Sequence, residues 1–523
     1  MRKIVSLRLK PSEAADSSLL FQLIAAESGG SKNSITGFTI LKRSIDARSR
    51  QPLINLSVEA FINEPYHKRE IIQIRFGDVS KVRNKVIIIG AGPAGLFAAL
   101  QLIEKGIKPI ILERGKDVKS RRRDLAVLNK EGIINPESNY CFGEGGAGTY
   151  SDGKLYTRST KRGDVNRILN LLFQFGADEK ILYEAHPHIG TNKLPQIITS
   201  IRKQITDAGG EFHFEKKVVD LKIVNAVVTK VVTADGTKLE GDSVILATGH
   251  SARDIFLLLH EKNISIQFKP FALGVRVEHP QSLIDSVQYH CSTRDEFLPP
   301  SSYSLVQQVD GKGVFSFCMC PGGIIAPAAT NPNELVVNGW SPSKRNNPFA
   351  NSGIVVSIEE NDILPYEKYG PLSGIYFQQE VEQEAYKAGG GKFVAPAQRL
   401  IDFCENKLST SLPNCSYLPG INPAALRDVL PPFINERLRI AFKEFGKKMK
   451  GYYTNDAVVV ATESRTSSPV RIPRNTEKLH HPQIKNMYPC GEGAGYAGGI
   501  VSAAMDGEKV ALAIVQAQLA TPF

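Results

Sequence analysis

The chain is predicted to be an α/β protein with a doubly wound, Rossmann-type domain, a β-rich α+β domain inserted into it, and a small N-terminal α+β domain. A buried strand, a glycine turn and a helix follow one another at residues 85–102. Strand and helix patterns return at 210–249 and 487–516, whereas β-rich stretches with Pro/Gly loops fill most of the interval between them. Such a recurrence is typical of a domain that is interrupted by another.

The glycine turn has the sequence Ile-Gly-Ala-Gly-Pro-Ala-Gly at residues 89–95. Gly90 permits a tight turn, Gly92 lets the backbone approach a diphosphate, and Gly95 lets the helix pack closely on the strand. The diphosphate would lie at the positive end of the helix that begins near Pro93 and Ala94. The pattern therefore predicts a dinucleotide site.

An acidic residue, Glu113, ends the next predicted strand. It follows Gly95 at close to the ~20-residue offset at which a carboxylate holds the ribose hydroxyls of a dinucleotide. A carboxylate there would repel a 2′-phosphate. FAD or NAD is therefore favoured over NADP.

The predicted domain boundaries follow these patterns. Residues 1–80 form the N-terminal domain, with strands at 4–9, 38–44, 53–62 and 71–76 and a helix at 17–26. The dinucleotide-binding domain occupies 83–262 and 476–523, and its last helix is expected at 501–513. The inserted domain occupies 263–475, with strands at 268–278, 303–308 and 314–320.

Composition places the chain among cytoplasmic globular proteins. Of its 523 residues 42% are hydrophobic, and the seven cysteines are scattered, which favours a reducing compartment over a disulfide framework. The uncharged window 86–103 is divided by glycines and a proline, so a strand and a helix explain it better than a membrane span. The net charge of +11 includes basic clusters at 42–50 and 116–123. It is interpreted as a solvated basic face or as help in holding an anionic cofactor and substrate.

Four segments resemble the two-domain FAD-dependent oxidoreductases of the glutathione reductase superfamily. They are 89–95, Glu-Arg-Gly at 113–115, Ile-Leu-Ala-Thr-Gly at 245–249 and Tyr-Pro-Cys-Gly-Glu-Gly-Ala-Gly at 488–495. Three more segments, 141–155, 317–323 and 463–471, are similar to an uncharacterised set of bacterial FAD-dependent dehydrogenases. This resemblance covers nearly the whole chain.

The resemblance implies FAD, bound non-covalently, and a glutathione reductase-like fold for the dinucleotide-binding domain. Glu492 stands where the family usually has Asp, on the ribityl or diphosphate side, and Val218 lies where such folds hold adenine with backbone groups. The full set of expected cofactor-binding residues is Gly90, Gly92, Pro93, Ala94, Gly95, Glu113, Arg114, Gly145, Gly146, Ala147, Gly148, Ser151, Asp152, Val218, Ala247, Thr248, Gly249, Gly491, Glu492, Gly499 and Ile500.

The glycine-rich loop 143–148 can also be interpreted from its residues alone. Small side chains let a backbone lie flat against an isoalloxazine ring or phosphates, although a plain flexible loop is the alternative.

Cys318 and Cys320 form a Cys-x-Cys pair on a predicted strand, where alternation would place both sulfurs on one face. They are interpreted mainly as structural cysteines of a buried strand, and the alternative is a redox sensor that works with the flavin.

Other polar clusters have competing interpretations. His186 and His188 lack the further ligands of a familiar metal set and are expected in a loop beside the cofactor; no metal is predicted. Arg465 and Arg471, with Glu463, either clamp an anionic substrate or pair with acids between domains.

The predicted function is that of an FAD-dependent oxidoreductase, a dehydrogenase that transfers hydride between a small-molecule substrate and the flavin. No second glycine fingerprint is found in the inserted region. The electron donor or acceptor is therefore expected to dock transiently. The alternatives are an aromatic-ring hydroxylase and, motivated by the charge, an FAD-containing protein that binds or modifies RNA. The sequence identifies no catalytic acid or base.

Overall fold

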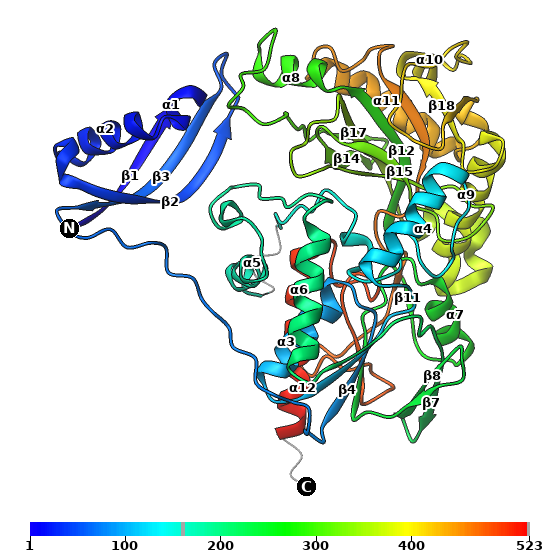
Figure 1. Ribbon diagram of the computed structural model, residues 1–523. Helices are drawn as coiled ribbons and strands as arrows, with labels where there is room; N and C mark the ends of the chain where they lie inside the picture. Colours follow the sequence, from blue (N-terminus) through cyan, green and yellow to red (C-terminus); the bar gives the residue numbers. More distant parts are fainter. Residues whose placement is uncertain (158–162, 520–523) are drawn as a thin grey trace.

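The protein, seen in a computed structural model that describes residues 1–157 and 163–519, is built around a five-stranded parallel sheet (Figure 1). The strand order is β22-β10-β4-β5-β6. The strands are β4 (Lys85–Ile89), β5 (Lys108–Leu112), β6 (Glu211–His213), β10 (Ser243–Leu246) and β22 (Met487–Pro489). The carboxyl ends of β4, β5, β10 and β22 meet at one edge, where ligands bind in folds of this kind.

Both faces of the parallel sheet are covered, which explains why its strands are hydrophobic throughout. Ile88 of β4 packs among the helices α3 (Pro93–Glu104), α5 (Val165–Gln174), α6 (Leu194–Asp207) and α12 (Ile500–Leu519). Its neighbours Ile87 and Ile89 point to the other face. That face carries a three-stranded sheet and helix α7 (Arg253–Glu261); the strands are β7 (Val218–Val224), β8 (Val227–Thr233) and β9 (Lys238–Leu239).

A seven-stranded mixed sheet forms the opposite end of the molecule (Figure 1). Its strands, in spatial order, are β13 (Val306–Val309), β14 (Lys312–Cys320), β17 (Phe349–Ile358), β12 (Phe271–Pro280), β20 (Val458–Glu463), β18 (Ala395–Arg399) and β19 (Ile421–Pro423). The associated helices are α8 (Gln281–Tyr289), α9 (Ser373–Gly389), α10 (Leu400–Glu405) and α11 (Pro432–Lys448). We call residues 271–463 the cap.

Shorter elements connect the two ends. The hairpin β15 (Ile324–Pro327) and β16 (Val337–Trp340) lies within the cap, and β11 (Gln267–Phe268) pairs with β21 (Val470–Arg471) at its base. Helix α4 (Val118–Glu131) leaves the parallel sheet after β5 and contacts β15. The 3-10 elements among the described residues are η1 (Lys32–Ser34), η2 (Gly146–Gly148), η4 (Glu179–Leu182), η5 (Glu360–Leu372) and η6 (Leu426–Asp428).

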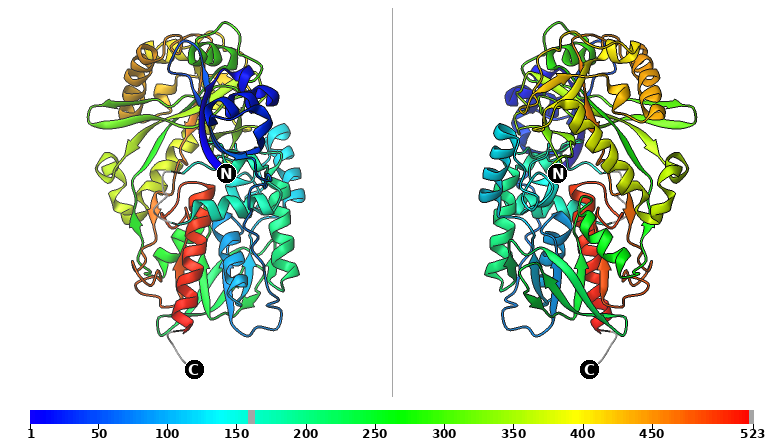
Figure 2. Two further views of the ribbon diagram at one scale, coloured as in Figure 1. Left: turned by 90° about the vertical axis from the view of Figure 1, so that its left-hand side faces the viewer. Right: turned by 90° about the vertical axis from the view of Figure 1, so that its right-hand side faces the viewer.

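The N-terminal segment forms a separate antiparallel sheet, β1 (Arg2–Leu9), β3 (Leu53–Ile62) and β2 (Ile35–Asp46), covered by α1 (Pro11–Ala15) and α2 (Ser17–Ser28). It stands to one side of the parallel sheet and is joined to it by an extended segment (Figures 1 and 2). Strand β2 is anchored to the main body: Arg43 N donates to Tyr183 O, and Ala185 N donates to Arg43 O, both at 2.9 Å.

Two expectations about strands were wrong in detail. Residues 71–76 form no strand, because the Gln174 side chain takes both backbone groups of Ile74, accepting from its N–H at 3.0 Å and donating to its carbonyl at 2.9 Å. The strand expected at 303–308 begins only at Val306. Among the described residues, no helix has the length and apolarity to cross a membrane.

Candidate functional site

The glycine turn after β4 is shaped by close backbone contacts. Gly90 has a φ of 107°, and a Cβ there would lie 2.4 Å from the carbonyl oxygen of Ala247. A Cβ on Gly95 would lie 2.0 Å from the carbonyl oxygen of Gly90, so any side chain would push α3 away from β4. Helix α3 begins after Gly92, which has no side-chain cap. Its first turn is therefore suited to an anionic group.

The buried carboxylate of Glu113 connects three loops. Its Oε2 accepts a hydrogen bond from Ala91 N at 2.9 Å, and its Oε1 accepts from Gly115 N at 2.8 Å and Gly143 N at 2.9 Å. A carboxylate has about four acceptor positions, so one on Oε2 is left for a ribose hydroxyl. Besides the expected ligand role, Glu113 thus holds the glycine turn and the loop 143–148 in place.

Arg121 is a structural residue that sequence reasoning missed, because it lies in the basic cluster assigned to the solvated surface. It is completely buried. Its guanidinium donates to the carbonyl oxygens of Asn139 at 2.8 Å, Tyr140 at 3.0 Å and Glu144 at 2.8 Å. Burial lowers the pKa of Arg121. The five donors of one guanidinium thereby fix the loop that leads into 143–148.

A cavity of about 380 Å³ opens at the carboxyl edge of the parallel sheet and extends to the cap. All of the predicted cofactor-binding residues line it except Gly95, Gly145 and Gly491. These three glycines lie outside the cavity wall, and their backbones make contacts within the protein. Gly95 serves helix packing, Gly145 N donates to Ala91 O at 2.9 Å, and Gly491 N donates to Asp506 Oδ2 at 2.8 Å.

At the far end of the cavity, Asp152 is buried and paired. Arg345 of the cap reaches its carboxylate at 2.7 Å, and Lys154 Nζ lies 3.6 Å away. Burial alone would raise the pKa of Asp152, but the charges of Lys154 and Arg345 lower it. Asp152 therefore remains ionised and holds Lys154 at the cavity wall. Lys154 was not among the predicted residues, although it stands only two positions after Asp152 in the same motif.

Residues 183–190, which we call the strap, form hydrogen bonds with the backbone on either side of Lys154. Leu155 N donates to Pro187 O at 2.9 Å, and Ile189 N donates to Gly153 O at 3.1 Å. The Nε2 of His188, in the same strap, lies 3.2 Å from Ser343 O. Within residues 1–157 and 163–519, no three His, Cys, Asp or Glu side chains are grouped as metal ligands.

Cys318 faces the cavity from the cap, whereas Cys320 is buried. The expected strand alternation fails here, because β14 is irregular between Phe317 and Cys320 and Cys318 has a φ of 47°. A hydrogen bond from the Cys320 side chain lowers the pKa of Cys318, burial opposes this, and the Lys154 charge lowers it further. The thiol thus stands in a strained, electropositive position of the kind found at reactive cysteines.

Glu492 and the glycines before α12 form another side of the cavity. Glu492 Oε2 lies 3.7 Å from His250 Nδ1, and both residues line the cavity. A Cβ placed on Gly499 would have no neighbouring atom within 4 Å, so the backbone before Ile500 is open to a ligand. This end of the cavity meets the N-terminus of α12.

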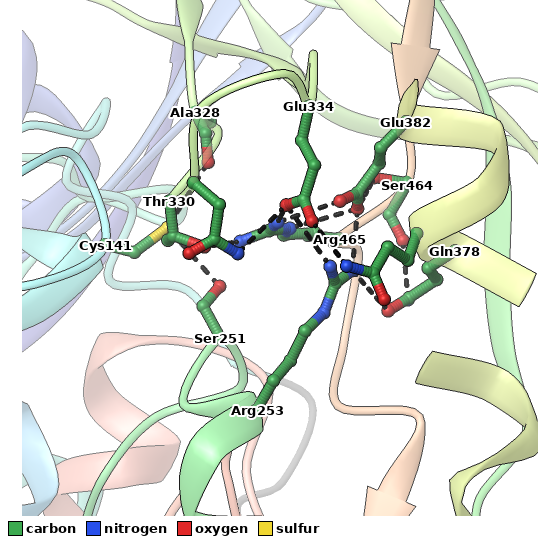
Figure 3. Close-up of polar contacts among 12 residues, drawn as sticks. Cys141, Ser251, Arg253, Ala328, Thr330, Glu334, Gln378, Glu382, Ser464 and Arg465 are labelled. Atoms are coloured by element: carbon green, nitrogen blue, oxygen red, sulfur yellow. Dashed lines mark hydrogen bonds and ion pairs between the residues drawn. The ribbon is translucent and has the colours of Figure 1, made fainter. Parts of the chain in front are cut away.

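A buried cluster of two arginines and two glutamates joins the cap to α7 (Figure 3). Arg465 Nη2 lies 2.8 Å from Glu382 and 3.1 Å from Glu334, and Arg253 Nη2 lies 2.9 Å from Glu382. The geometry favours pairing between acids and bases over an anion clamp for Arg465. Arg471 is exposed, with its guanidinium 4.8 Å from the Tyr496 ring centre, so the three charged residues at 463–471 do not form one cluster.

Comparison with family models gives three matches. Residues 83–131 match the FAD binding domain, residues 270–466 match "FAD-dependent protein, C-terminal domain-like", and residues 1–61 match a domain of unknown function. A Clostridium beijerinckii protein called "Uncharacterized protein" is 39% identical over 520 residues, covering 96% of each chain. Thiamine thiazole synthase of Aeropyrum pernix is 26% identical over 211 residues, which cover 37% of this chain and 66% of that protein.

Similarities to solved structures are weak. The flavoprotein/dehydrogenase from Cytophaga hutchinsonii aligns with a TM-score of 0.37 at 12% identity, covering 84% of this chain and 80% of that one. Glycine oxidase from Bacillus cereus aligns with a TM-score of 0.31 at 13% identity, covering 83% and 96%. Neither similarity contributes to the functional assignment.

Replacing Glu113 with glutamine tests its role as the anchor of the loops. The NH2 group of glutamine is itself a donor and cannot accept the backbone N–H bonds that a carboxylate oxygen accepts. Glu113→Gln is therefore expected to loosen the loops and to lower the affinity for FAD at least 10-fold, about 1.4 kcal/mol. Fluorescence titration of the deflavinated protein with FAD measures this. The exposed Glu27→Gln is the matched control, and unchanged affinity in Glu113→Gln would contradict the assignment.

The buried cluster predicts a pH dependence of stability. Burial alone would raise the pKa of Glu382, but Arg253, Arg465 and the Ser464 hydroxyl lower it to about 2. Since this is below the pKa of an unfolded glutamate, its contribution is complete above about pH 5 and is lost as the pH falls toward 2.

Glu382→Gln is therefore expected to cost ~3–5 kcal/mol at pH 7, with a difference from wild type that shrinks as the solution is acidified. Thermal unfolding of both proteins from pH 7 to pH 3 measures it. A difference that stays constant over this range would show that the carboxylate charge is not responsible.

Proposed function

The chain is an FAD-binding protein of the family that includes the Clostridium beijerinckii protein, and from this premise we propose that it is a dehydrogenase. In this proposal a small molecule exchanges hydride with non-covalently bound FAD. The observation that carries the proposal is the continuous cavity, which runs from the glycine turn of the parallel sheet to Lys154 and Cys318 beside the cap.

The proposed orientation of FAD follows from the chemistry of the cavity wall. Adenine would lie near Val218 and the ribose at Glu113. The diphosphate would lie at the first turn of α3, where Gly92, Pro93 and Ala94 face the cavity. The flavin would then lie between the loop 146–148 and the start of α12, where Gly499 and Ile500 line the wall.

Bound FAD would supply the two-electron chemistry, and the chain would supply its charge environment. The N-terminus of α12 and the Lys154 ammonium both place positive charge at the flavin end. Such charge stabilises an anionic reduced ring. Asp152 keeps Lys154 in place, and the paired Arg345 closes that end against the cap.

The proposal is tested by the visible spectrum and by anaerobic reduction. The purified protein is expected to be yellow, and a dehydrogenase substrate is expected to bleach the flavin band without oxygen. Rapid reduction by NAD(P)H, followed by substrate-stimulated oxygen consumption, would instead support a hydroxylase. A colourless protein that takes up no added FAD would refute the site itself.

Alkylation gives an independent test of where the flavin ring lies. Because Cys318 faces the cavity, its reaction with iodoacetamide is expected to be at least 10-fold slower in the FAD-loaded protein than in the deflavinated one. Cys291 lies outside the cavity and is the internal control. Mass spectrometry of peptides measures both rates. Equal rates at Cys318 with and without FAD would place the ring elsewhere.

A further inference from the structure

A second, smaller cavity of about 70 Å³ adjoins the first at its flavin end. The two cavities share part of their walls, from the glycine-rich loop and its flanking residues, the segment after β10, the cap and the residues just after it. The shared residues are Cys141, Ala147, Ser151, His250, Cys318, Asn338 and Arg465. A molecule that lies over the flavin can therefore extend one end into this side cavity.

The side cavity is walled mainly by rings and small aliphatic side chains. Its aromatic members are Tyr140, Tyr150 and Trp340, and its aliphatic members include Ala326, Ala328, Val336 and Val337. Both tyrosine hydroxyls make a hydrogen bond within the protein. Tyr150 Oη donates to Val118 O at 2.9 Å, and Tyr140 Oη accepts from Asn129 Nδ2 at 3.0 Å. The indole N–H of Trp340 is buried and has no hydrogen-bond partner among the described residues. Apart from this group and the Tyr140 hydroxyl hydrogen, these side chains offer carbon surface to a ligand.

Glu463 and Arg465, the acidic and the basic side chain in the wall of the side cavity, are neutralised within the protein. Glu463 accepts from Arg276 Nε at 2.5 Å and from its Nη2 at 3.0 Å. Arg465 pairs with Glu382 and Glu334 and also donates to Thr330 Oγ1 at 2.7 Å. Neither charge is free for a ligand. An ionised substrate group would lose its hydration without gaining a partner.

Asn338 supplies a hydrogen-bond donor where the two cavities meet. Its Oδ1 accepts from Arg276 Nη2 at 3.2 Å and from Gly339 N at 2.7 Å, which fixes the orientation of the amide. Its Nδ2 has no hydrogen-bond partner within residues 1–157 and 163–519. This nitrogen can therefore donate to an acceptor oxygen of a bound molecule.

We propose that the side cavity is a substrate subsite for an uncharged molecule with an aromatic end group and an acceptor oxygen that binds Asn338. The inference rests on the proposed function, because the rest of the molecule would lie over the flavin. A cavity of ~150 Å³ encloses benzene, so the side cavity accepts the edge of one ring, and the remainder projects into the larger cavity.

Benzamide and benzoate test the proposal, since they have nearly the same shape and differ in charge. Flavin difference spectroscopy and calorimetry on the FAD-loaded protein at pH 7.5 are expected to show benzamide binding at least 10-fold more tightly than benzoate. Asn338→Leu is expected to weaken benzamide binding at least 10-fold. Asn166→Leu, at an exposed position of α5, is the matched control.

The experiment distinguishes failure of the subsite proposal from failure of the proposed function. Benzoate binding as tightly as benzamide, or unchanged benzamide affinity in an Asn338→Leu protein with wild-type FAD content and melting temperature, would overturn it. A protein that holds FAD but binds neither probe overturns this proposal alone. If the protein held no FAD, the proposed function would fail, while calorimetry would still compare the two probes.

Discussion

The cavity depends on one buried carboxylate. Glu113 accepts hydrogen bonds from the backbone of three loops, at Ala91, Gly115 and Gly143. Glycine-rich turns have few side chains whose packing could fix the backbone. Each backbone N–H group that is buried there also needs a hydrogen-bond acceptor. A single charged acceptor satisfies three of them and fixes the distance between the glycine turn and the loop 143–148. The slot between these loops follows from that constraint.

Much of the fold could be predicted from local sequence, because its main signals are short. The run 85–102 contains strand, turn and helix in one continuous pattern, and the structure has β4, the turn and α3 there. The isolated hydrophobic run 71–76 shows the limit of such reasoning. It has strand character, yet its backbone is satisfied by the distant Gln174, which periodicity cannot reveal.

The same limit applies to the candidate site. Residues carried by the glycine motifs could be found, and most of them line the cavity. Arg121 and Asn338 could not, because their roles depend on partners outside their own local sequence pattern. In the sequence, Arg121 stands in a basic cluster that is typical of a protein surface. In the structure it is buried because its guanidinium binds backbone carbonyls of residues 139–144. Gly491 shows the reverse: its motif suggests a ligand contact, but Asp506 takes its N–H.

Neutralised charge recurs in the cap and in the segments that border it. Arg276, Arg465 and Arg253 are all buried, and each is matched to a glutamate inside the protein. Buried ion pairs of this kind contribute little net stability but depend strongly on geometry. The cluster around Glu382 therefore acts chiefly to define how the cap meets α7, and with it the shape of the cavity beside Arg465.

The attachment of the N-terminal sheet has a consequence for the wall of the cavity that contains Lys154. Strand β2 binds one part of the strap 183–190 through Arg43, and another part of the same strap binds the backbone around Lys154. One short segment thus connects a peripheral module to the segment that carries Lys154 at the cavity wall. Displacement of the module would remove the hydrogen bonds of Arg43 from the strap, and the strap's remaining backbone bonds lie beside Lys154 at the cavity wall.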